Sequence, residues 1–597
     1  MTRLPSERRR IERGSVVVLT VLALAAIAIG PMVLDTYSVS ILIRSFLYGA
    51  VAITVDVLWG YTGILSFGQS VFFGIGAYAL GLASTHLDFT TPVALGASVA
   101  GPLTAAAVAW LVAWLGFGPR VSPLYLSVIT LVQAVIFVQL IYTGGDFTGS
   151  SSGLSGFDTF NVGMDAWFRI AGTGLVIAIA VGWAFVRSDV GRLLVAIREN
   201  EQRCSYCGID TMRVKTLLLV SSAVVAAVAG YAYAGFNDVI APDLGNFQFG
   251  TQMVIWVALG GRGTLLGPAI SAVLIDFVSA YLSGSLPFVW QLFVGLVFIV
   301  VIVLMPQGFG PAVAKAARWT FRWRGRAALV APRLALLSNR DISDVGQEPA
   351  IEITDLCRSY GSLAVLSGIS FSARPGELVS LVGPNGAGKT TLIRCISDGL
   401  ERTSGSVKIR GTSIGRMTPE GCVHLGLGRK FQAPNVFDAL TVADSLRIAR
   451  SRQEPLSMWQ RADEVRLPAA AMRVVHATGL DDQLGATVKH LSHGSKQALE
   501  LAMVLAMQPH VLLLDEPTAG LTKAERVAIG AILVDLVKKH RLCILLIEHD
   551  LDFVRDISSR IIVLHQGKIA LDGSVVEVTS SELVRTIYAG EPGALGE

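Results

Sequence analysis

This chain has little charge and few cysteines for its length. Only 16% of its 597 residues are charged, against about 25% in an average soluble domain, and the deficit lies almost entirely before residue 310. The formal net charge is +4, with neither a basic stripe nor an acidic tail, so the charge pattern predicts no nucleic-acid binding. Four of the six cysteines are scattered through the second half, which predicts a reducing compartment without structural disulfides.

The other two cysteines, Cys204 and Cys207, form a C-x-x-C pair. A zinc site usually needs four ligands, and no second pair lies nearby in the sequence. We therefore interpret the pair as incidental small residues, with a metal or redox role as the alternative.

In place of charge, the first half of the chain holds apolar runs of membrane-spanning length. Because 597 residues are too many for one core, the sequence predicts at least two domains. Five arginines precede the first run, which favours an uncleaved helix with a cytoplasmic N-terminus over a signal peptide. We expect eight to ten membrane segments, with both chain ends cytoplasmic. The long runs are 16–34, 38–59, 91–116, 124–143, 168–186, 216–235 and 289–305, and the shorter or glycine-interrupted ones are 70–85, 247–260 and 266–283.

A glycine- and hydroxyl-rich segment, residues 60–69, separates the second run from the next. Irregular backbone at membrane depth is tolerated only where protein or a water-filled cavity surrounds it. In transporters such breaks often line the substrate path, whereas small residues also allow helices to pack closely. The sequence leaves both interpretations open.

Residues 188–215 are the one long charged segment of the apolar half, and their basic content predicts a cytoplasmic location. A cytoplasmic segment between spans is the natural surface for a soluble domain to act on. We expect it to contact the second half of the chain near Gln432, with Arg198 and Glu199 involved in coupling. A merely solvated loop is the alternative.

The segment between the two halves of the chain contains basic residues interleaved with tryptophans. This composition suits a segment lying along the inner membrane surface. These residues are Lys315, Arg318, Trp319, Arg322, Trp323, Arg324 and Arg326. We therefore predict a polytopic α-helical membrane domain over 1–306, a basic linker over 307–348 and a soluble domain over 349–597.

A phosphate-binding loop stands near the start of the soluble half. The pattern G-x-x-x-x-G-K-T follows the apolar run 378–382, which predicts a buried strand, and opens a helical pattern at Thr391. In this context backbone N–H groups cradle phosphates, Lys389 neutralises their charge and Thr390 can ligate Mg²⁺. The sequence thus predicts an α/β P-loop domain that binds nucleotide through Gly383, Asn385, Gly386, Gly388, Lys389, Thr390 and Thr391.

Further motifs follow in the order and spacing of an ABC-type ATPase, which residues 350–597 resemble. They are Tyr360, Gln432 within GRKFQ, the sequence LSHGSKQ over 491–497, Asp515 and Glu516 after VLLL, and His549. The resemblance implies that Tyr360 stacks on adenine, and that Gln432 approaches the Mg²⁺ ion and the attacking water. It also implies that Ser492 and Gly494, at a helix N-terminus, contact the γ-phosphate held by an opposite subunit.

The chemistry of the remaining side chains agrees with these roles. Asp515 can hold the metal ion through water, and Glu516 can polarise the attacking water as a general base. His549 can hydrogen-bond the γ-phosphate. The chain departs from the family at Thr522, where Asp or Asn is usual, and His493 and Ser495 alter the usual LSGGQ signature.

Residues 40–306 resemble the permeases of branched-chain amino-acid and urea importers. The matching segments are WGYTG at 59–63, AIRENE at 196–201 and WVALGGRGT at 256–264. Details of the ATPase half resemble the urea and short-chain amide branch more than the amino-acid branch. These details are the segments Gly428 to Gln432 and Leu491 to Gly494, and Thr522. Permease and ATPase, usually separate subunits in such systems, are fused here.

The leading hypothesis is an ATP-driven importer subunit for small polar nitrogen compounds in the cytoplasmic membrane. The resemblance implies ATP and Mg²⁺ as cofactors and three partners, namely a second permease subunit, a second ATPase subunit and an extracytoplasmic substrate-binding protein. An ABC exporter half-transporter is the alternative, since its domains follow the same order. A receptor or channel gated by nucleotide would differ in not requiring Glu516.

Overall fold

The computed structural model describes residues 5–118, 123–285, 333–337, 348–462 and 464–589, with a few isolated positions between 292 and 310. The chain divides into two compact units, one of residues 1–194 and 212–327 and the other of residues 195–211 and 328–597. The short segment 195–211 therefore belongs with the C-terminal unit. The domain boundaries expected at 306/307 and 348/349 lie in or beside residues outside the described part, and they stay predictions.

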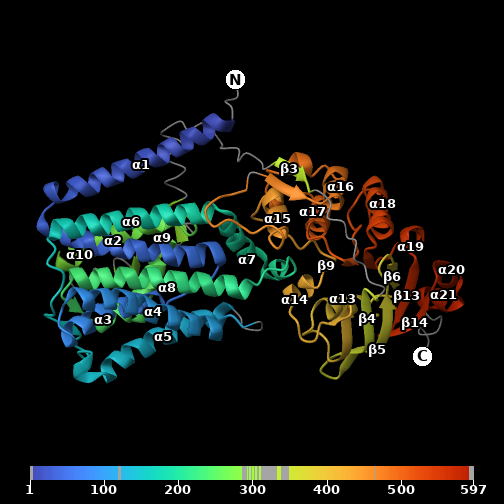
Figure 1. Cartoon of the computed structure of the whole chain (residues 1–597), viewed down its shortest axis with the longest axis horizontal. Coiled ribbons are helices and arrows are strands. Elements are labelled where there is room, and N and C mark those ends of the chain that lie inside the picture. Colours follow the sequence, from blue (N-terminus) through green and yellow to red (C-terminus); the bar gives the residue numbers. More distant parts are fainter. Residues whose placement is uncertain are drawn as a thin grey trace. The chain divides into compact units, whose positions relative to one another are not determined.

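The first unit is built from long helices that lie side by side (Figure 1). Helix α2 packs along both α6 and α10, and α3 packs along α4. A two-stranded antiparallel ribbon, β1–β2, joins loops at one end. The elements are α1 (Pro5–Val33), α2 (Thr36–Asp56), the π-helix η1 (Val57–Tyr61), α3 (Gln69–His86), α4 (Thr91–Gly116), α5 (Pro123–Thr143), η2 (Gly145–Phe147), β1 (Leu154–Ser155), α6 (Met164–Arg187), α7 (Asp189–Ser205, shared between the units), α8 (Thr211–Phe236), β2 (Val239–Ile240), η3 (Pro242–Gly245), α9 (Phe247–Gly260) and α10 (Leu266–Ser285).

Among the described residues, six helices are long and apolar enough to cross a membrane. Five of them coincide with predicted long runs. The sixth, Leu266–Gly284, coincides with the run 266–283, one of the three predicted segments described as shorter or glycine-interrupted. The run 16–34 lies in α1, whose apolar part Thr20–Val33 is shorter, and the run 289–305 lies mostly outside the described residues. The total of eight to ten segments stays a prediction.

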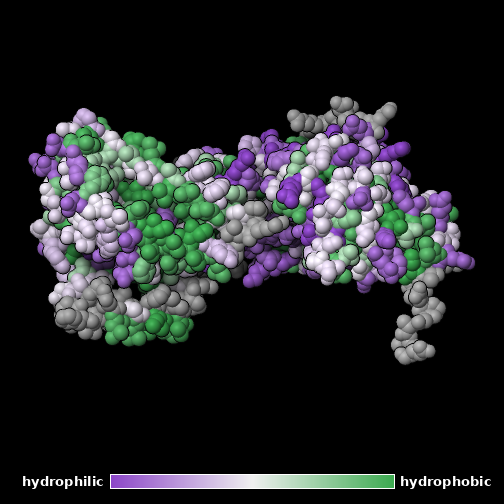
Figure 2. Space-filling model, turned by 90° about the horizontal axis from the view of Figure 1, so that it is seen from below, coloured by the Kyte–Doolittle hydropathy of each residue, from purple (hydrophilic) through white to green (hydrophobic). Residues whose placement is uncertain are grey.

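The surface of this unit agrees with a membrane environment. On the face shown in Figure 2, broad hydrophobic areas cover the unit that contains the long helices, whereas the other unit carries more hydrophilic residues. Large apolar side chains are exposed along α4, α5 and α6, among them Leu103, Trp114, Leu124, Leu140 and Ile177. Such a surface is costly in water and suits contact with lipid.

The break after α2 is a site of close backbone packing. There α2 passes into the π-helix η1, and a Cβ atom added to Gly60 would lie 2.6 Å from the nitrogen of Gly263. The buried carboxylate of Asp56 accepts hydrogen bonds from the N–H groups of Gly263 at 2.6 Å and Leu265 at 2.8 Å. Glycine at position 60 is therefore needed for packing, which supports that interpretation of the segment 60–69.

The other acidic residue within a span, Asp276 of α10, also has structural partners. Arg44 of α2 donates to both of its carboxylate oxygens at 3.2 Å, and Ser45 donates to it at 2.6 Å. This bidentate pair links α2 to α10 midway along both helices.

The second unit has a six-stranded sheet in the order β14-β13-β6-β12-β11-β9, parallel except for β14. A four-stranded antiparallel sheet, β5-β4-β7-β8, and a parallel pair, β10-β3, complete it. The elements are β3 (Arg333–Leu336), β4 (Ile351–Tyr360), β5 (Leu363–Ala373), β6 (Leu378–Val382), α13 (Lys389–Ser397), β7 (Ser404–Ile409), β8 (Thr412–Ser413), α14 (Pro419–His424), β9 (Leu427–Lys430), α15 (Val442–Ala449), β10 (Glu464–Leu467), α16 (Ala469–Ala477), η4 (Asp481–Gln483), η5 (Val488–His490), α17 (His493–Ala506), β11 (Val511–Asp515), α18 (Lys523–His540), β12 (Cys543–Ile547), α19 (Leu551–Ile557), β13 (Arg560–His565), β14 (Lys568–Gly573), α20 (Val575–Ser580) and α21 (Glu582–Ala589).

Three central strands of this sheet, β6, β11 and β12, have every residue buried. Continuous apolar runs of this kind are typical of parallel sheets covered on both faces. Because parallel strands end at the same edge, the segments that follow these three strands lie together. These segments are the phosphate loop after β6, Asp515 and Glu516 at the end of β11, and His549 after β12. The predicted fold class, a helical membrane domain followed by an α/β P-loop domain, is confirmed.

One further prediction concerned the linker 307–348. The basic and tryptophan residues singled out in it, between Lys315 and Arg326, lie outside the described residues. Within the linker the structure describes Arg333–Leu336, which form strand β3 and pair in parallel with β10.

Candidate nucleotide-binding site

The phosphate loop owes its shape to glycines. Gly388 has φ 99° and directly precedes α13, and a Cβ atom there would lie 2.7 Å from Cδ2 of Leu366. Gly386 has φ 83°, and among the described residues nothing beyond its chain neighbours lies within 4 Å of the position that its Cβ would take. The loop is thus an open cradle at the N-terminus of α13, where backbone N–H groups favour an anion.

Lys389 lies across this cradle. Its Nζ atom donates to the carbonyls of Gly383 at 2.7 Å and Pro384 at 3.0 Å. Burial lowers the pKa of Lys389, and the neighbouring carboxylates of Glu516 and Asp515 act in the opposite direction. The ammonium group is therefore held between the loop and the acidic residues at the end of β11.

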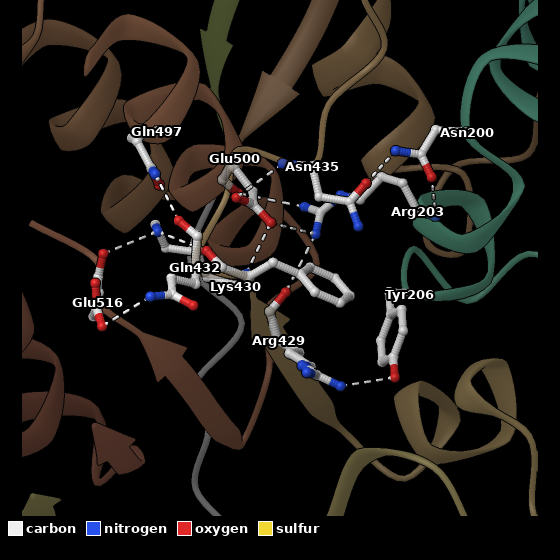
Figure 3. Close-up of polar contacts among 11 residues, drawn as sticks. Asn200, Arg203, Tyr206, Arg429, Lys430, Gln432, Asn435, Gln497, Glu500 and Glu516 are labelled. Carbon is white, nitrogen blue, oxygen red and sulfur yellow. Dashed lines mark hydrogen bonds and ion pairs between the residues drawn. The ribbon is translucent and has the colours of Figure 1, made fainter. Parts of the chain in front are cut away.

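A pocket of about 330 Å³ joins the phosphate loop to the predicted hydrolytic residues. Its lining includes Asn385–Thr391, Gln432, Glu516 and His549. Oε1 of Glu516 lies 3.0 Å from Nε2 of Gln432, which donates to it, and 2.9 Å from Nε2 of His549. The side chains of Gln432 and His549, from two different loops, thus meet at the carboxylate of Glu516 (Figure 3 shows Gln432 and Glu516).

The acidic residue before Glu516 lies deeper. Asp515 is 1% exposed, and its Oδ1 atom accepts no hydrogen bond within the described part of the chain. Burial raises the pKa of Asp515, and a hydrogen bond from Thr390 opposes this effect. Carboxylate and hydroxyl oxygens are the ligands that Mg²⁺ prefers. Thr390 and Asp515 therefore fit a magnesium site beside the phosphate loop.

Tyr360, the predicted adenine-stacking residue, ends β4 and is 46% exposed. It is not among the described residues that line the pocket. The guanidinium of Arg358 lies 4.2 Å from the centre of its ring and also pairs with Glu401 at 3.2 Å. One face of the ring thus carries a cation, an arrangement that orients the ring and restricts stacking to its other face.

The altered signature sequence starts α17, as predicted. Ser492 is the N-cap, and its Oγ atom accepts a hydrogen bond from the backbone of Ser495 at 3.1 Å. Thr522 likewise caps α18, in a reciprocal capping box with Glu525. Neither Ser492 nor Gly494 is among the residues that line the pocket. Ser492 and Thr522 thus stabilise the starts of α17 and α18.

The contact expected between the charged segment and the region of Gln432 is confirmed within the second unit. Tyr206 accepts a hydrogen bond from Arg429 at 3.0 Å and packs edge-on against Phe431 at 5.0 Å, and Asn200 donates to Asn435 (Figure 3). The segment is helical, as α7, with non-helical dihedral angles at Asn200. Arg198 and Glu199, which the sequence singled out, pair with each other at 3.3 Å.

The cysteine pair lies in the same segment. Cys204 and Cys207 are free thiols and fully buried, and burial raises the pKa of both. Among the described residues, no group of three or more His, Cys, Asp or Glu could hold a metal ion. Protonated, buried thiols are unreactive, which agrees with the interpretation of incidental small residues.

Both halves of the chain match known families. Residues 37–303 match the branched-chain amino acid transport system permease component, and residues 366–519 match the ABC transporter family. The high-affinity branched-chain amino acid transport ATP-binding protein LivG of Salmonella typhimurium is 31% identical over 253 residues, which are 41% of this chain and 99% of LivG. The chain belongs to the ABC transporter family.

Other relatives of the ATP-binding half are named for the transport of different substrates. BraF of Pseudomonas aeruginosa, another high-affinity branched-chain amino acid transport ATP-binding protein, is 29% identical over 41% of this chain and 98% of BraF. The methionine import ATP-binding protein MetN of Brucella abortus is 36% identical over 38% of this chain and 61% of MetN. This ABC transporter is a multi-pass membrane protein with permease and cytoplasmic ATPase domains in one chain, and it couples ATP hydrolysis to transport.

Proposed function

We propose that this ABC transporter imports small polar nitrogen compounds, either branched-chain amino acids or urea and short-chain amides, across the cytoplasmic (inner) membrane. The observation that carries the proposal is the match of residues 37–303 to the branched-chain amino acid permease family. The names of LivG and BraF support it. MetN, named for methionine import, is 36% identical, so similarity in the ATP-binding half does not choose among substrates.

The proposed complex contains a second permease subunit, a second ATPase subunit and an extracytoplasmic substrate-binding protein. The position of the signature residues supports a second ATPase. Ser492 and Gly494 do not line the pocket that contains Lys389. A nucleotide in that pocket is thus enclosed only when a second ATP-binding domain presents its own signature residues.

The proposed roles in hydrolysis follow from the geometry of the pocket. Backbone N–H groups of residues 383–391 and the ammonium of Lys389 hold the phosphates, while Tyr360 stacks on the adenine. Glu516 accepts a proton from the attacking water. Hydrogen bonds from Gln432 and His549 orient the carboxylate of Glu516. Thr390 and Asp515 would hold Mg²⁺, with Gln432 nearby, and the ion would neutralise charge on the phosphates.

Uptake by proteoliposomes that contain the chain, co-purified with its partner subunits, tests this function. Labelled leucine, urea and acetamide are supplied outside with the binding protein, and ATP is supplied on the side of the ATPase. We expect ATP-dependent accumulation of one of them, and none with Glu516→Gln. Extrusion in place of accumulation would show an exporter. Flux that needs ATP but survives Glu516→Gln would show a nucleotide-gated channel.

A further inference from the structure

Two cationic side chains and one carboxylate are buried together beneath the loop that carries Gln432 (Figure 3). Arg203 lies in the segment 195–211, Lys430 ends β9 and Glu500 lies in α17. None of the three side chains is exposed. The Nη1 atom of Arg203 lies 3.4 Å from Oε1 of Glu500 and donates to the carbonyl of Arg429 at 3.2 Å.

The carboxylate of Glu500 holds both ends of the short stretch that contains Gln432. Oε1 accepts a hydrogen bond from the backbone N–H of Phe431 at 3.0 Å, and Oε2 accepts one from that of Asn435 at 3.3 Å. One turn earlier in α17, Gln497 donates to the carbonyl of Gln432 at 2.9 Å. The position of Gln432 is therefore set from α17.

Lys430 reaches in the other direction, toward the proposed general base. Its Nζ atom donates to the carbonyl of Phe431 at 3.0 Å and to that of Glu516 at 3.4 Å. The backbone of Glu516 has φ 46°, a left-handed conformation that residues with a side chain seldom adopt unless their surroundings impose it. The ammonium of Lys430 is one of the groups that hold this backbone.

The pKa of Glu500 and the pKa of Lys430 each depend on the neighbouring charged groups. Burial raises the pKa of Glu500, and first Arg203 and then Lys430 oppose that rise. Burial lowers the pKa of Lys430, while Glu500, Asp515 and Glu548 act against it. Removing one partner of a buried ion pair leaves an uncompensated charge, which is strongly unfavourable. Without Arg203, the carboxylate of Glu500 would therefore attract the ammonium of Lys430.

We propose that Lys430 is a positioning residue for Glu516, and that Arg203 keeps it in place by pairing with Glu500. The inference rests on the proposed role of Glu516 as general base. When Arg203 withdraws, Lys430 turns toward Glu500. The carbonyl of Glu516 then keeps the N–H of Ala519 at 3.4 Å but loses the charged donor, and hydrolysis slows. Rapid ATP hydrolysis thus requires the segment 195–211 to be docked.

The test compares kcat and KM for ATP in the purified complex in lipid nanodiscs. Arg203→Met should lower kcat roughly 10-fold or more with little change in KM, because an interaction that positions the base is lost while nucleotide contacts remain. Lys430→Met should do the same, and Lys430→Arg should keep more activity. Arg466→Met, which removes an exposed ion pair with Glu464, is the matched control and should leave kcat unchanged.

The deciding variant combines Arg203→Met with Glu500→Gln. A neutral amide does not attract Lys430, so kcat should return to within about threefold of the value for Glu500→Gln alone, a non-additive result that a packing defect does not produce. A double variant as slow as Arg203→Met would overturn the inference. Normal turnover by Glu516→Gln would instead overturn the proposed general base, so the two failures are distinguishable.

Discussion

The Nε2 atom of His549 lies 2.9 Å from Oε1 of Glu516, the same oxygen that accepts a hydrogen bond from Gln432 at 3.0 Å. The loops after β12 and β9 thus meet at a carboxylate that follows β11. A phosphate or water that enters the pocket competes for these donors and for this oxygen. Occupancy of the pocket is therefore linked to the orientation of Glu516.

Replacing Glu516 with glutamine should separate binding from hydrolysis. The amide keeps the size of the side chain but cannot accept a proton, so we expect turnover to fall by about 100-fold or more. ATP should still bind, because Lys389 and the phosphate loop are untouched. Phosphate release and the affinity for a fluorescent ATP analogue, measured on one preparation, check both parts. Unchanged turnover would exclude Glu516 as the general base.

Lys389→Ala should have the opposite effect, with nucleotide binding itself lost. The substitution removes the fixed positive charge that faces the phosphates, so we expect affinity for ATP to fall at least about 10-fold and transport to stop. Lys568→Ala, at an exposed position on β14, is the control and should bind ATP normally. Near-normal ATPase activity of Lys389→Ala would contradict the site assignment.

Features of the fold that depend on local sequence were predictable. The strand 378–382, the glycines of the phosphate loop and the start of α17 at Ser492 each follow from a few consecutive residues. The long apolar runs predicted helices for the same reason. The number of membrane spans was harder to predict. Leu266–Gly284 contains polar and glycine residues, yet its mean hydropathy is high enough for a span.

Pairings between distant segments could not be predicted. Arg203 and Glu500 are 297 positions apart, and Asp56 and Leu265 are 209 apart. Charge alone directed attention to Arg198 and Glu199. The non-helical dihedral angles at Asn200 change the direction of α7 between those residues and the ones that contact Arg429 and Asn435, and a single sequence gives no sign of this change.

Removing the hydroxyl of Tyr206 should weaken the coupling between transport and hydrolysis without a large structural change. It accepts a hydrogen bond from Arg429 at 3.0 Å and lies 3.3 Å from Oγ of Ser397. Tyr206→Phe keeps the ring against Phe431 but removes these polar contacts, so we expect uptake per ATP hydrolysed to fall roughly two- to fivefold, the effect of about 0.5–1 kcal/mol. Tyr125→Phe, at an exposed position on α5, is the control. An equal loss of uptake and hydrolysis would indicate misfolding.

Asp56 should matter for the stability of the membrane unit. Its buried carboxylate accepts hydrogen bonds from the backbone N–H groups of Gly263 and Leu265, just before α10 begins. Asp56→Ala leaves both groups buried without this acceptor, at a cost of about 1–3 kcal/mol for each unsatisfied group. We expect a lower unfolding temperature in detergent, with Asp56→Asn intermediate because its amide oxygen can still accept. Asp146→Ala, at an exposed position, should unfold like the original protein. If Asp56→Ala unfolded at the same temperature as Asp146→Ala, the carboxylate would not stabilise the start of α10.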